Sequence, residues 1–316
     1  MGKNPANPGI AVVIPTYNRA DVLSRAIDSV LRSRRTDIEL AVIDDASSDD
    51  TRNVLESYRD PRLTARHLQK RSNGNVARNE GIRATSAPVI AFLDSDDEFL
   101  EGRLERLVGY FEAHPNVGTV ADSFRTEKTG VFYNAGIPDI VVERAELERL
   151  LVSHAIPLTT SSICVRRSAI EGIGGFDTQL RRQQDRDILL RLAHVTPIAL
   201  GTGDDVVKHQ ISQSVSRSTA GYVEGLDSLV ARHPVFRRPE YRDILAYLAV
   251  RSVLKSLFAG QFRFAGMEAL ALRQAGNLAV SLSSAIFRYP HGKYLRRNAV
   301  ADMVRRKSAH ANAPSA

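Results

Sequence analysis

The chain has a single cysteine, Cys164, among its 316 residues. One cysteine excludes an intramolecular disulfide framework and a zinc site built from several cysteines, and it suits a reducing compartment. No run reaches the ~18 apolar residues that a membrane-spanning helix needs. Residues 1–9 contain one lysine and no apolar segment, so we expect no secretory signal. We therefore expect a cytoplasmic protein that could lie peripherally on the inner face of the plasma membrane.

Acidic residues are scarce at the end of the chain. Residues 288–316 contain seven Lys or Arg against Asp302 alone, which gives +6 of the total formal net charge of +7. This basic tail favours an anionic membrane surface, where each Lys or Arg contributes ~1 kcal/mol, and we expect no nucleic acid partner. The alternative is a solvated terminus. The hydrophobic content of 43% is ordinary for a folded globular chain.

Strand-length apolar runs alternate with helical patterns over the first hundred residues. Val22, Ala26 and Val30, for example, recur at the spacing of an amphipathic helix. Alternating strands and helices imply βαβ units, so we predict an α/β fold with a mostly parallel, Rossmann-like sheet flanked by helices. The four predicted strands are Ile10–Ile14, Glu39–Ile43, Leu63–Leu68 and Val89–Leu93.

Polar residues end three of these strands. The fourth strand stops at Asp94, Ser95, Asp96 and Asp97, the second stops at Asp44 and Asp45, and the first stops at Pro15, Thr16, Tyr17 and Asn18. Ligands of open α/β sheets bind at the carboxyl ends of the strands, and carboxylate oxygens are the ligands that hard divalent cations prefer. The pattern predicts a nucleotide and metal site. The alternative is a solvated acidic turn that caps the following helix.

Six blocks of the sequence resemble, in order and spacing, those of the family 2 glycosyltransferases. The resemblance covers roughly residues 9–218 and implies the GT-A fold and a nucleotide-diphosphate sugar as donor. The blocks are Val13-Ile14-Pro15-Thr16-Tyr17-Asn18, Val42-Ile43-Asp44-Asp45-Ala46-Ser47, Asn75-Val76-Ala77-Arg78-Asn79-Glu80-Gly81, Leu93-Asp94-Ser95-Asp96-Asp97, Gly174-Gly175-Phe176-Asp177 and Gln184-Asp185-Arg186-Asp187-Ile188-Leu189-Leu190-Arg191-Leu192.

For the donor, the resemblance implies that Asp45 accepts a hydrogen bond from the base. A carboxylate only accepts, so a base with a free imide N–H is favoured, as in UDP- or dTDP-sugars. Asp45 as a turn or cap residue is the alternative. Arg78 would contact the pyrophosphate or hold the acidic loop, or else be a solvated helix residue. The backbone that passes along base and ribose is formed by Pro15, Thr16, Tyr17 and Asn18.

The resemblance also implies a cofactor, Mn²⁺ or Mg²⁺, that bridges the two donor phosphates. Asp96 would be its direct ligand, and Asp94 would contact the ribose or a metal-bound water, with Ser95 on the substrate side. Asp97 is expected to begin the next helix, as a cap or as an acid behind the ligands. His209 is a candidate ligand that lies two or three positions from the family's histidine, and Arg217 could pair with the diphosphate.

Asp185 is the candidate catalytic base. It opens a predicted amphipathic helix, and from there it could deprotonate an acceptor hydroxyl during an inverting attack on the sugar. The family usually has Glu-Asp here, whereas this chain has Gln184-Asp185. Asp187 is the competing base, and a helix cap is the alternative role for Asp185. The acceptor is expected to be a glycan or a lipid-linked molecule in surface polysaccharide or glycan biosynthesis.

Four regions are expected: a flexible N-terminus (1–8), a catalytic domain (9–218), a helical extension (219–287) and a basic tail (288–316). The extension should be broken at Gly260, Gly266, Gly276 and Pro290, and it could pack on the catalytic domain, form a homodimer or lie on a membrane.

Two other functions compete with the glycosyltransferase. A nucleotidyltransferase should carry a Gly-rich phosphate loop after strand one, which this chain lacks. A non-catalytic nucleotide-sugar binding or scaffolding module would not need Asp94, Asp96 and Asp185, which this chain has.

Overall fold

The computed structural model describes residues 8–128, 131–134, 137, 139–209, 221–278 and 282–311. Its contacts divide the chain into two compact units. The sheet unit comprises Met1–Glu143, Leu158–Thr178 and Arg191–Ile211, and the helical unit comprises Arg144–Pro157, Gln179–Leu190 and Ser212–Ala316. The helical unit thus takes two segments that lie before the boundary expected at 218/219.

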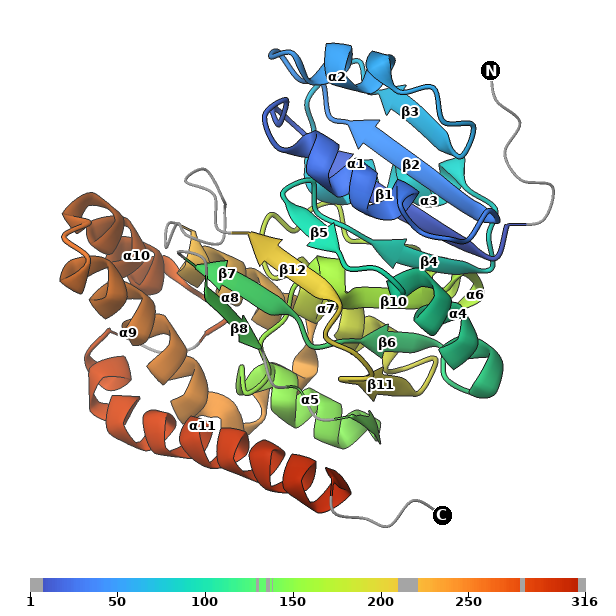
Figure 1. The fold of residues 1–316 in the computed structure, drawn as a ribbon. Coiled ribbons are helices and arrows are strands. Elements are labelled where there is room, and N and C mark those ends of the chain that lie inside the picture. Colours follow the sequence, from blue (N-terminus) through green and yellow to red (C-terminus); the bar gives the residue numbers. More distant parts are fainter. Residues whose placement is uncertain are drawn as a thin grey trace. The chain divides into compact units, whose positions relative to one another are not determined.

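The sheet unit holds an eight-stranded sheet in the order β3-β2-β1-β4-β10-β6-β11-β9 (Figure 1). The first four of these strands run parallel, β10 is antiparallel to both of its neighbours, β11 is parallel to β6, and β9 is antiparallel to β11. The strands are β1 (Ile10–Thr16), β2 (Ile38–Asp44), β3 (Leu63–His67), β4 (Val89–Phe92), β6 (Thr119–Ala121), β9 (Ile140–Val142), β10 (Ile163–Arg166) and β11 (Ile198–Leu200).

A second sheet has the order β5-β12-β7-β8. Its strands are β5 (Asp97–Phe99), β7 (Arg125–Lys128), β8 (Val131–Asn134) and β12 (Val206–His209). Asp97 therefore begins a strand, and the expectation that it begins a helix is wrong, because β5 pairs with the distant β12 in the register Lys208↔Asp97. The next helix, α4 (Arg103–Ala113), starts only at Arg103.

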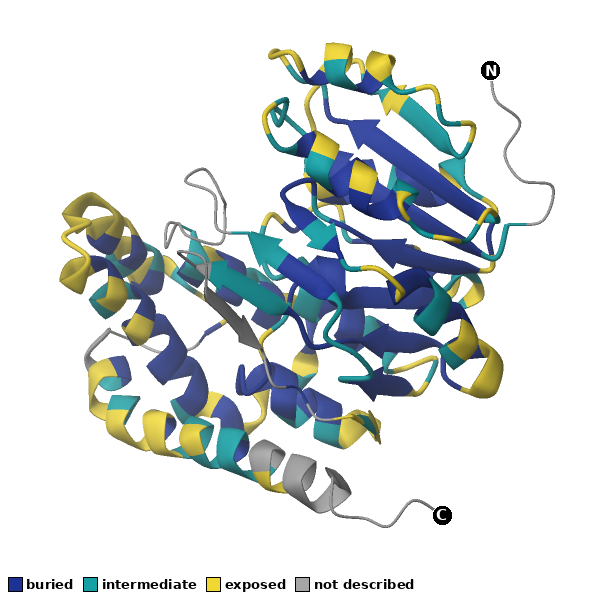
Figure 2. Cartoon of the chain, in the orientation of Figure 1, coloured by how far each residue is buried: buried dark blue, intermediate teal, exposed yellow. Residues whose placement is uncertain are grey.

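Helices cover the large sheet, whose strands β1, β2 and β4 are buried along their length (Figure 2). Helix α1 (Leu23–Leu31) buries Leu23, Ala26, Ile27 and Val30, and each fully buried aliphatic side chain contributes about 1.5–3 kcal/mol. Helix α3 (Gly74–Ala84) packs closely on β1, because a Cβ at Gly81 would lie 2.2 Å from Val13 Cγ1. The remaining helices of the unit are α2 (Thr51–Ser57), α6 (Arg167–Gly172) and a 3₁₀ turn, Thr160–Ser162.

The helical unit contains α5 (Arg144–Val152), α8 (Tyr222–Arg232), α9 (Arg242–Phe258), α10 (Phe262–Gln274), α11 (Leu282–Ala311), the first seven residues of α7 (Gln184–Leu192) and the 3₁₀ turns Pro234–Arg237 and Pro239–Tyr241. Gly260 and Gly276 do separate helices, whereas Gly266 and Pro290 lie inside them. Packing against α9 overrides the local preference at Pro290, since a Cβ at nearby Gly292 would lie 1.9 Å from the Asp243 carbonyl oxygen. Helix α11 runs through the boundary expected at 287/288.

None of the helices that the structure describes combines the length and the apolar content needed to cross a bilayer.

Candidate active site

The carboxyl ends of β1, β2 and β4 meet at one edge of the large sheet. The register pairs Thr16 with Asp44 and Val13 with Phe92. The backbone N–H of Asp45 donates to the carbonyl of Thr16 at 2.9 Å, which continues the ladder by one residue. The three polar strand ends predicted from the sequence therefore lie together.

Asp45 and its neighbour Asp44 are both buried but have different partners. Asp44 is fully engaged, by the backbone and hydroxyl of Ser47 on one oxygen and by His67 at 3.0 Å on the other. Asp45 accepts hydrogen bonds from the N–H and the hydroxyl of Ser72 on Oδ1 alone, at 2.8 and 2.6 Å. Within the described ranges its Oδ2 has no such partner, so one acceptor oxygen remains for a ligand.

The loop after β1 is tied to the loop after β2. The Asn18 N–H donates to Ser47 Oγ, and its side-chain oxygen accepts from the Ser48 N–H, both at 2.8 Å. Asn18 and Ala46 both have positive φ, 49° and 60°, which non-glycine residues adopt at a cost. Tyr17 lies under the guanidinium of Arg71, which is 4.1 Å from the ring centroid. These contacts fix the backbone that passes along the predicted base and ribose.

Arg78, on α3, contacts the acidic loop, by which we mean residues Asp94–Asp97. Its Nη2 is 2.6 Å from Asp94 Oδ1, and its Nη1 donates to Asn75 at 3.2 Å. Burial raises the pKa of Asp94, but the positive charges of Arg78 and Lys208 outweigh burial and hold that pKa below its usual value. Asp94 is therefore ionised and forms an ion pair with Arg78. This contact agrees with the expectation that Arg78 holds the loop, and its contact with the pyrophosphate stays a prediction.

Asp97 and Asp96 carry charge less readily. Burial raises the pKa of Asp97 to about 7, with the charges of Asp94 and Asp96 adding to burial and Lys208, 3.6 Å away, opposing it. Burial and the charge of Asp94 likewise raise the pKa of Asp96. Burial lowers the pKa of Lys208, but the three carboxylates raise it to about 12. One fixed lysine thus sits among three acids that repel each other.

These three carboxylates fit a divalent cation. One oxygen from each of Asp94, Asp96 and Asp97 lies within 4.8 Å of the others. The buried Oδ1 of Asp97 has no hydrogen-bond partner among the described residues, and no described side chain bonds the carboxylate of Asp96. Such an oxygen-rich set, with open positions and carboxylates that repel each other, suits Mg²⁺ or Mn²⁺.

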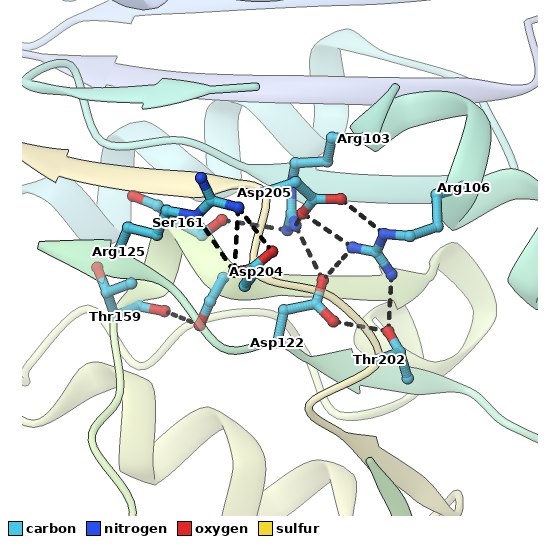
Figure 3. Close-up of polar contacts among 10 residues, drawn as sticks. Arg103, Arg106, Asp122, Arg125, Thr159, Ser161, Thr202, Asp204 and Asp205 are labelled. Carbon is cyan, nitrogen blue, oxygen red and sulfur yellow. Dashed lines mark hydrogen bonds and ion pairs between the residues drawn. The ribbon is translucent and has the colours of Figure 1, made fainter. Parts of the chain in front are cut away.

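Ser161 holds the acidic loop from the other side. Its hydroxyl donates to Asp97 Oδ2 at 2.6 Å and accepts the Asp94 N–H at 3.0 Å. Its carbonyl oxygen accepts from Arg103, which is fully buried. Figure 3 shows the buried ion-pair network that continues from there through Arg106, Asp122, Asp205 and Thr202. No sequence motif marks Ser161; its one local signal is a polar run, Thr159–Ser162, before a buried strand.

The Gly174–Asp177 block packs on α3. The side-chain amide of Asn79 donates to the Phe176 carbonyl and accepts the Phe176 N–H, both at 2.8 Å. Gly175 has φ +76°, and a Cβ there would lie 2.6 Å from Asn79 Oδ1, so a glycine is required. Two blocks that are separate in the sequence therefore form one structure.

His209 lies between two glutamates. Its Nδ1 bonds Glu127, and its Nε2 bonds Glu98 at 3.1 Å. Both ring nitrogens are therefore engaged, and His209 does not belong to the group of acids that could share one ion. Its role as a ligand stays a prediction. Arg217 lies outside the described residues.

In the helical unit, Asp185 and Asp187 have different environments. Asp187 is buried and bonds His233 Nε2 at 2.8 Å. Asp185 is 17% exposed and accepts the Arg186 N–H at 2.9 Å. Ile188, Leu189 and Leu192 are fully buried, which agrees with the amphipathic helix predicted to open at Asp185. Of the two acids, Asp185 is the more exposed.

Comparison with known proteins agrees with the sheet and its acidic edge. The family model described as glycosyl transferase family 2 matches residues 11–174, just over half of the chain. The chain therefore belongs to glycosyl transferase family 2.

Two curated relatives and one solved structure illustrate the likeness. An uncharacterized glycosyltransferase of Haemophilus influenzae is 26% identical over 184 residues, which are 58% of this chain and 61% of that protein. A putative teichuronic acid biosynthesis glycosyltransferase of Bacillus subtilis is 35% identical over 31% of this chain and 40% of its own length. The chain thus matches less than two thirds of either relative. The S. aureus TarS 1–349 structure with UDP-GlcNAc is 17% identical, with a TM-score of 0.62 over 95% of this chain and 91% of that one, so it is similar in fold.

Proposed function

We propose that this chain is an inverting glycosyltransferase that moves a sugar from a nucleotide-diphosphate sugar to an acceptor hydroxyl. The observation that carries the proposal is the edge of the large sheet, where a buried carboxylate with an open oxygen (Asp45) and a group of three acids (Asp94, Asp96 and Asp97) share one unit. A nucleotide sugar needs both, a polar partner for its base and countercharge for its diphosphate.

Asp45 supports a pyrimidine donor. Its open oxygen can only accept a hydrogen bond, so it favours the imide N–H of uracil or thymine, and thus a UDP- or dTDP-sugar. The likeness in fold to a structure that holds UDP-GlcNAc agrees with this choice. The base and ribose would lie along Pro15, Thr16, Tyr17 and Asn18.

The acidic loop would hold Mn²⁺ or Mg²⁺, with Asp96 as a direct ligand and Asp94 and Ser95 on the side of the ribose. The bound ion would stabilise the negative charge that builds up on the departing diphosphate. Arg78 and Lys208 keep the loop in place through their ion pairs with Asp94 and Asp97.

Asp185 would be the general base. Its carboxylate would take the proton of the acceptor hydroxyl while that oxygen attacks the anomeric carbon opposite the diphosphate, which inverts the configuration. Asp187 is less suited, because its hydrogen bond to His233 already occupies it. The Bacillus relative's name supports a glycan or lipid-linked acceptor in surface polysaccharide assembly.

We also propose that the C-terminal helices bind an anionic membrane surface. Residues 251–311 contain eleven Lys or Arg against two Asp or Glu, and Phe258 and Phe287 are 88% and 87% exposed. Exposed aromatic and basic side chains together suit an anionic interface. Changing the exposed residues Lys293 and Arg297 to Gln should weaken the free energy of binding to phosphatidylglycerol vesicles by ~1 kcal/mol per residue. Sedimentation with the vesicles measures this binding. Equal binding to neutral phosphatidylcholine vesicles would contradict this.

The function is tested by nucleoside diphosphate release from a panel of sugar donors, with and without Mn²⁺. We expect release from a UDP- or dTDP-sugar that depends on the ion and on an acceptor. Release of inorganic pyrophosphate from a nucleoside triphosphate would instead indicate a nucleotidyltransferase. Donor binding by calorimetry without turnover on any acceptor would indicate a non-catalytic module.

A further inference from the structure

The charges of three arginines of the helical unit act on the same two side chains, His154 and Tyr222. We call this group the arginine cluster: Arg186 on α7, Arg251 on α9 and Arg296 on α11, with His154 after α5 and Tyr222 at the start of α8. Arg296 Nη2 donates to the His154 carbonyl at 3.0 Å, and the Tyr222 hydroxyl is 3.2 Å from His154 Nδ1. No motif connects these residues in the sequence.

The positive charges of the arginine cluster repel each other. Burial lowers the pKa of Arg296, and the charges of Arg251 and Arg186 lower it further. Burial likewise lowers the pKa of His154 well below its usual value, followed by the charges of all three arginines. Arg186 and Arg296 are partly buried and Arg251 is exposed. Charges removed from water are normally paired with an opposite charge, so an anion bound by this group would stabilise it.

Few acids of the helical unit lie near the arginine cluster. Asp187 bonds His233 and Asp243 bonds Arg288. The buried Glu268 borders the cluster, but its oxygens accept the N–H groups of Tyr222 and Val223. Asp185 lies 3.9 Å from Arg186 Nη1. The residues that the structure does not describe contain no Asp or Glu, so their side chains cannot supply the missing charge.

Several donors of the arginine cluster are open. Arg186 Nε, Arg296 Nε and His154 Nε2 are buried and have no hydrogen-bond partner among the described residues. His154 is only 9% exposed. When its Nδ1 accepts the Tyr222 hydroxyl proton, the neutral ring carries its own proton on Nε2, which then donates. Arg251, whose charge acts on both His154 and Arg296, is exposed to solvent and can meet an ion there.

We infer that the arginine cluster binds an oxyanion of the acceptor, a phosphate or carboxylate group. The planar guanidinium of Arg matches both groups with two parallel hydrogen bonds. The inference rests on the proposed function in one respect: Asp185 precedes Arg186, so an anion held by Arg186 brings a neighbouring hydroxyl toward the base. The acceptor would then be a phosphodiester polymer, a lipid phosphate or an acidic sugar rather than a neutral glycan.

The first test measures binding of inorganic phosphate and pyrophosphate to the full chain by calorimetry. EDTA is present throughout, so that no divalent ion can carry phosphate to the acidic loop. We expect Arg251→Gln to weaken binding at least tenfold and Arg251→Lys to weaken it less. The matched control is Arg242→Gln, which removes the same charge from an exposed position at the start of α9 and should bind like wild type. Equal weakening by both Gln variants would overturn the site.

The second test is thermal unfolding. Phosphate should raise the midpoint of the wild type by binding its folded state, and it should raise that of Arg251→Gln less. Without phosphate, Arg251→Gln should unfold at the same temperature as the wild type or higher, because it relieves repulsion. A lower midpoint together with unchanged phosphate binding would make Arg251 a purely structural residue and overturn the inference.

Kinetics then identify the source of the anion. Matched acceptors carry a phosphate, a carboxylate or a neutral group beside the same hydroxyl. Arg251→Gln should raise KM at least tenfold for the acidic acceptor that fits, with kcat and UDP affinity unchanged. An equal KM change for the neutral acceptor would overturn the inference. If the wild type turns over no donor but binds phosphate as above, the proposed function fails and the anion site stands.

Discussion

The acidic loop of the sheet unit and the arginine cluster of the helical unit are opposite in sign and differ in how far they are neutralised. In the loop, the charges of Arg78, Lys208 and Arg19 act on Asp94, Asp96 and Asp97. In the cluster, Asp185 lies 3.9 Å from Arg186, and the charges of Arg186 and Arg251 act against that of Arg296. The loop is therefore nearly neutral, whereas the cluster carries an excess of positive charge.

This difference teaches what each region needs. A loop that is nearly neutral folds without its ion. It can then accept a divalent cation when Asp96 and Asp97 release their protons and the carboxylates shift slightly. A cluster with unbalanced charge and open buried donors gains more from its ligand, because an unsatisfied buried donor costs about 1–3 kcal/mol. We therefore expect ligand removal to destabilise the helical unit more than the sheet unit, and four predictions test the contrast.

The largest effect should come from Asp185→Asn. Loss of a positioned general base costs ~10²–10⁴ in rate, while stability should barely change, since Asn has the same shape. The variant for comparison is Asp187→Asn, which breaks the buried bond to His233. It should lower the free energy of unfolding, with a smaller effect on the rate of transfer than Asp185→Asn has. Steady-state kinetics and urea unfolding of both variants measure this. An inactive Asp187→Asn beside an active Asp185→Asn would assign the base to Asp187.

The second prediction concerns the metal-free acidic loop. Asp97 ionises near 3.8 when unfolded and near 7 when folded, so the folded state holds the proton more tightly. Its contribution to stability is present below about pH 4 and is lost as the pH rises toward 7, at up to ~1.4 kcal/mol per pH unit. In EDTA, the stability of Asp97→Asn relative to that of the wild type should therefore increase between pH 5 and pH 8. A constant difference in urea midpoint across that range would contradict the assignment.

The arginine cluster should respond to pH in the opposite direction. The pKa of His154 is lowered well below 6.5 on folding, so the unfolded chain binds the proton more tightly. Its contribution is present above pH 6.5 and is lost as the pH falls, again at up to ~1.4 kcal/mol per unit. In His154→Gln, the free energy of unfolding should fall less steeply as the pH drops below 6.5. Saturating phosphate should have the same effect on the wild type. An unchanged slope in the variant would place the titration elsewhere.

The smallest effect should come from the base contact. Asp45→Ala removes one hydrogen bond to the nucleotide from a charged acceptor and should weaken UDP binding by ~1–3 kcal/mol. Because Asp45 also holds Ser72, Asp45→Asn is the matched variant that keeps the shape of that turn. Calorimetry with UDP and CDP measures the difference, and equal affinity for UDP in all three proteins would reduce Asp45 to a turn residue.

The sequence predicted the parts of the site that depend on local pattern. The strands before Asp45 and Asp94 show as apolar runs, and parallel pairing then brings their ends together without further information. The helix predicted to begin at Asp97 is a strand in the structure, because Asp97 pairs with Lys208 on the distant β12 and no local pattern shows that pairing. The break predicted at Pro290 is wrong for a similar reason, because packing against α9 supports the helix around it.

The residues that sequence reasoning missed act across long separations. Ser161 reaches back to Asp94 and Asp97, and Asn79 reaches forward to Phe176. Serine and asparagine are common on any surface, so their types carry little information. The arginine cluster is harder still, since Arg186, Arg251 and Arg296 lie on three helices and become a group only when those helices pack.

The pairing of Asp97 with Lys208 has a consequence for synthesis of the chain. The acids emerge from the ribosome first, while the hydroxyl and the ammonium group that hold them lie about 65 and 110 residues later. At roughly 5–20 residues per second, the acidic loop waits about 6–20 seconds for its lysine. During that interval the nascent chain carries the acids without the geometry to use them. A half-made chain should therefore be unable to capture the divalent ion or to hydrolyse the donor.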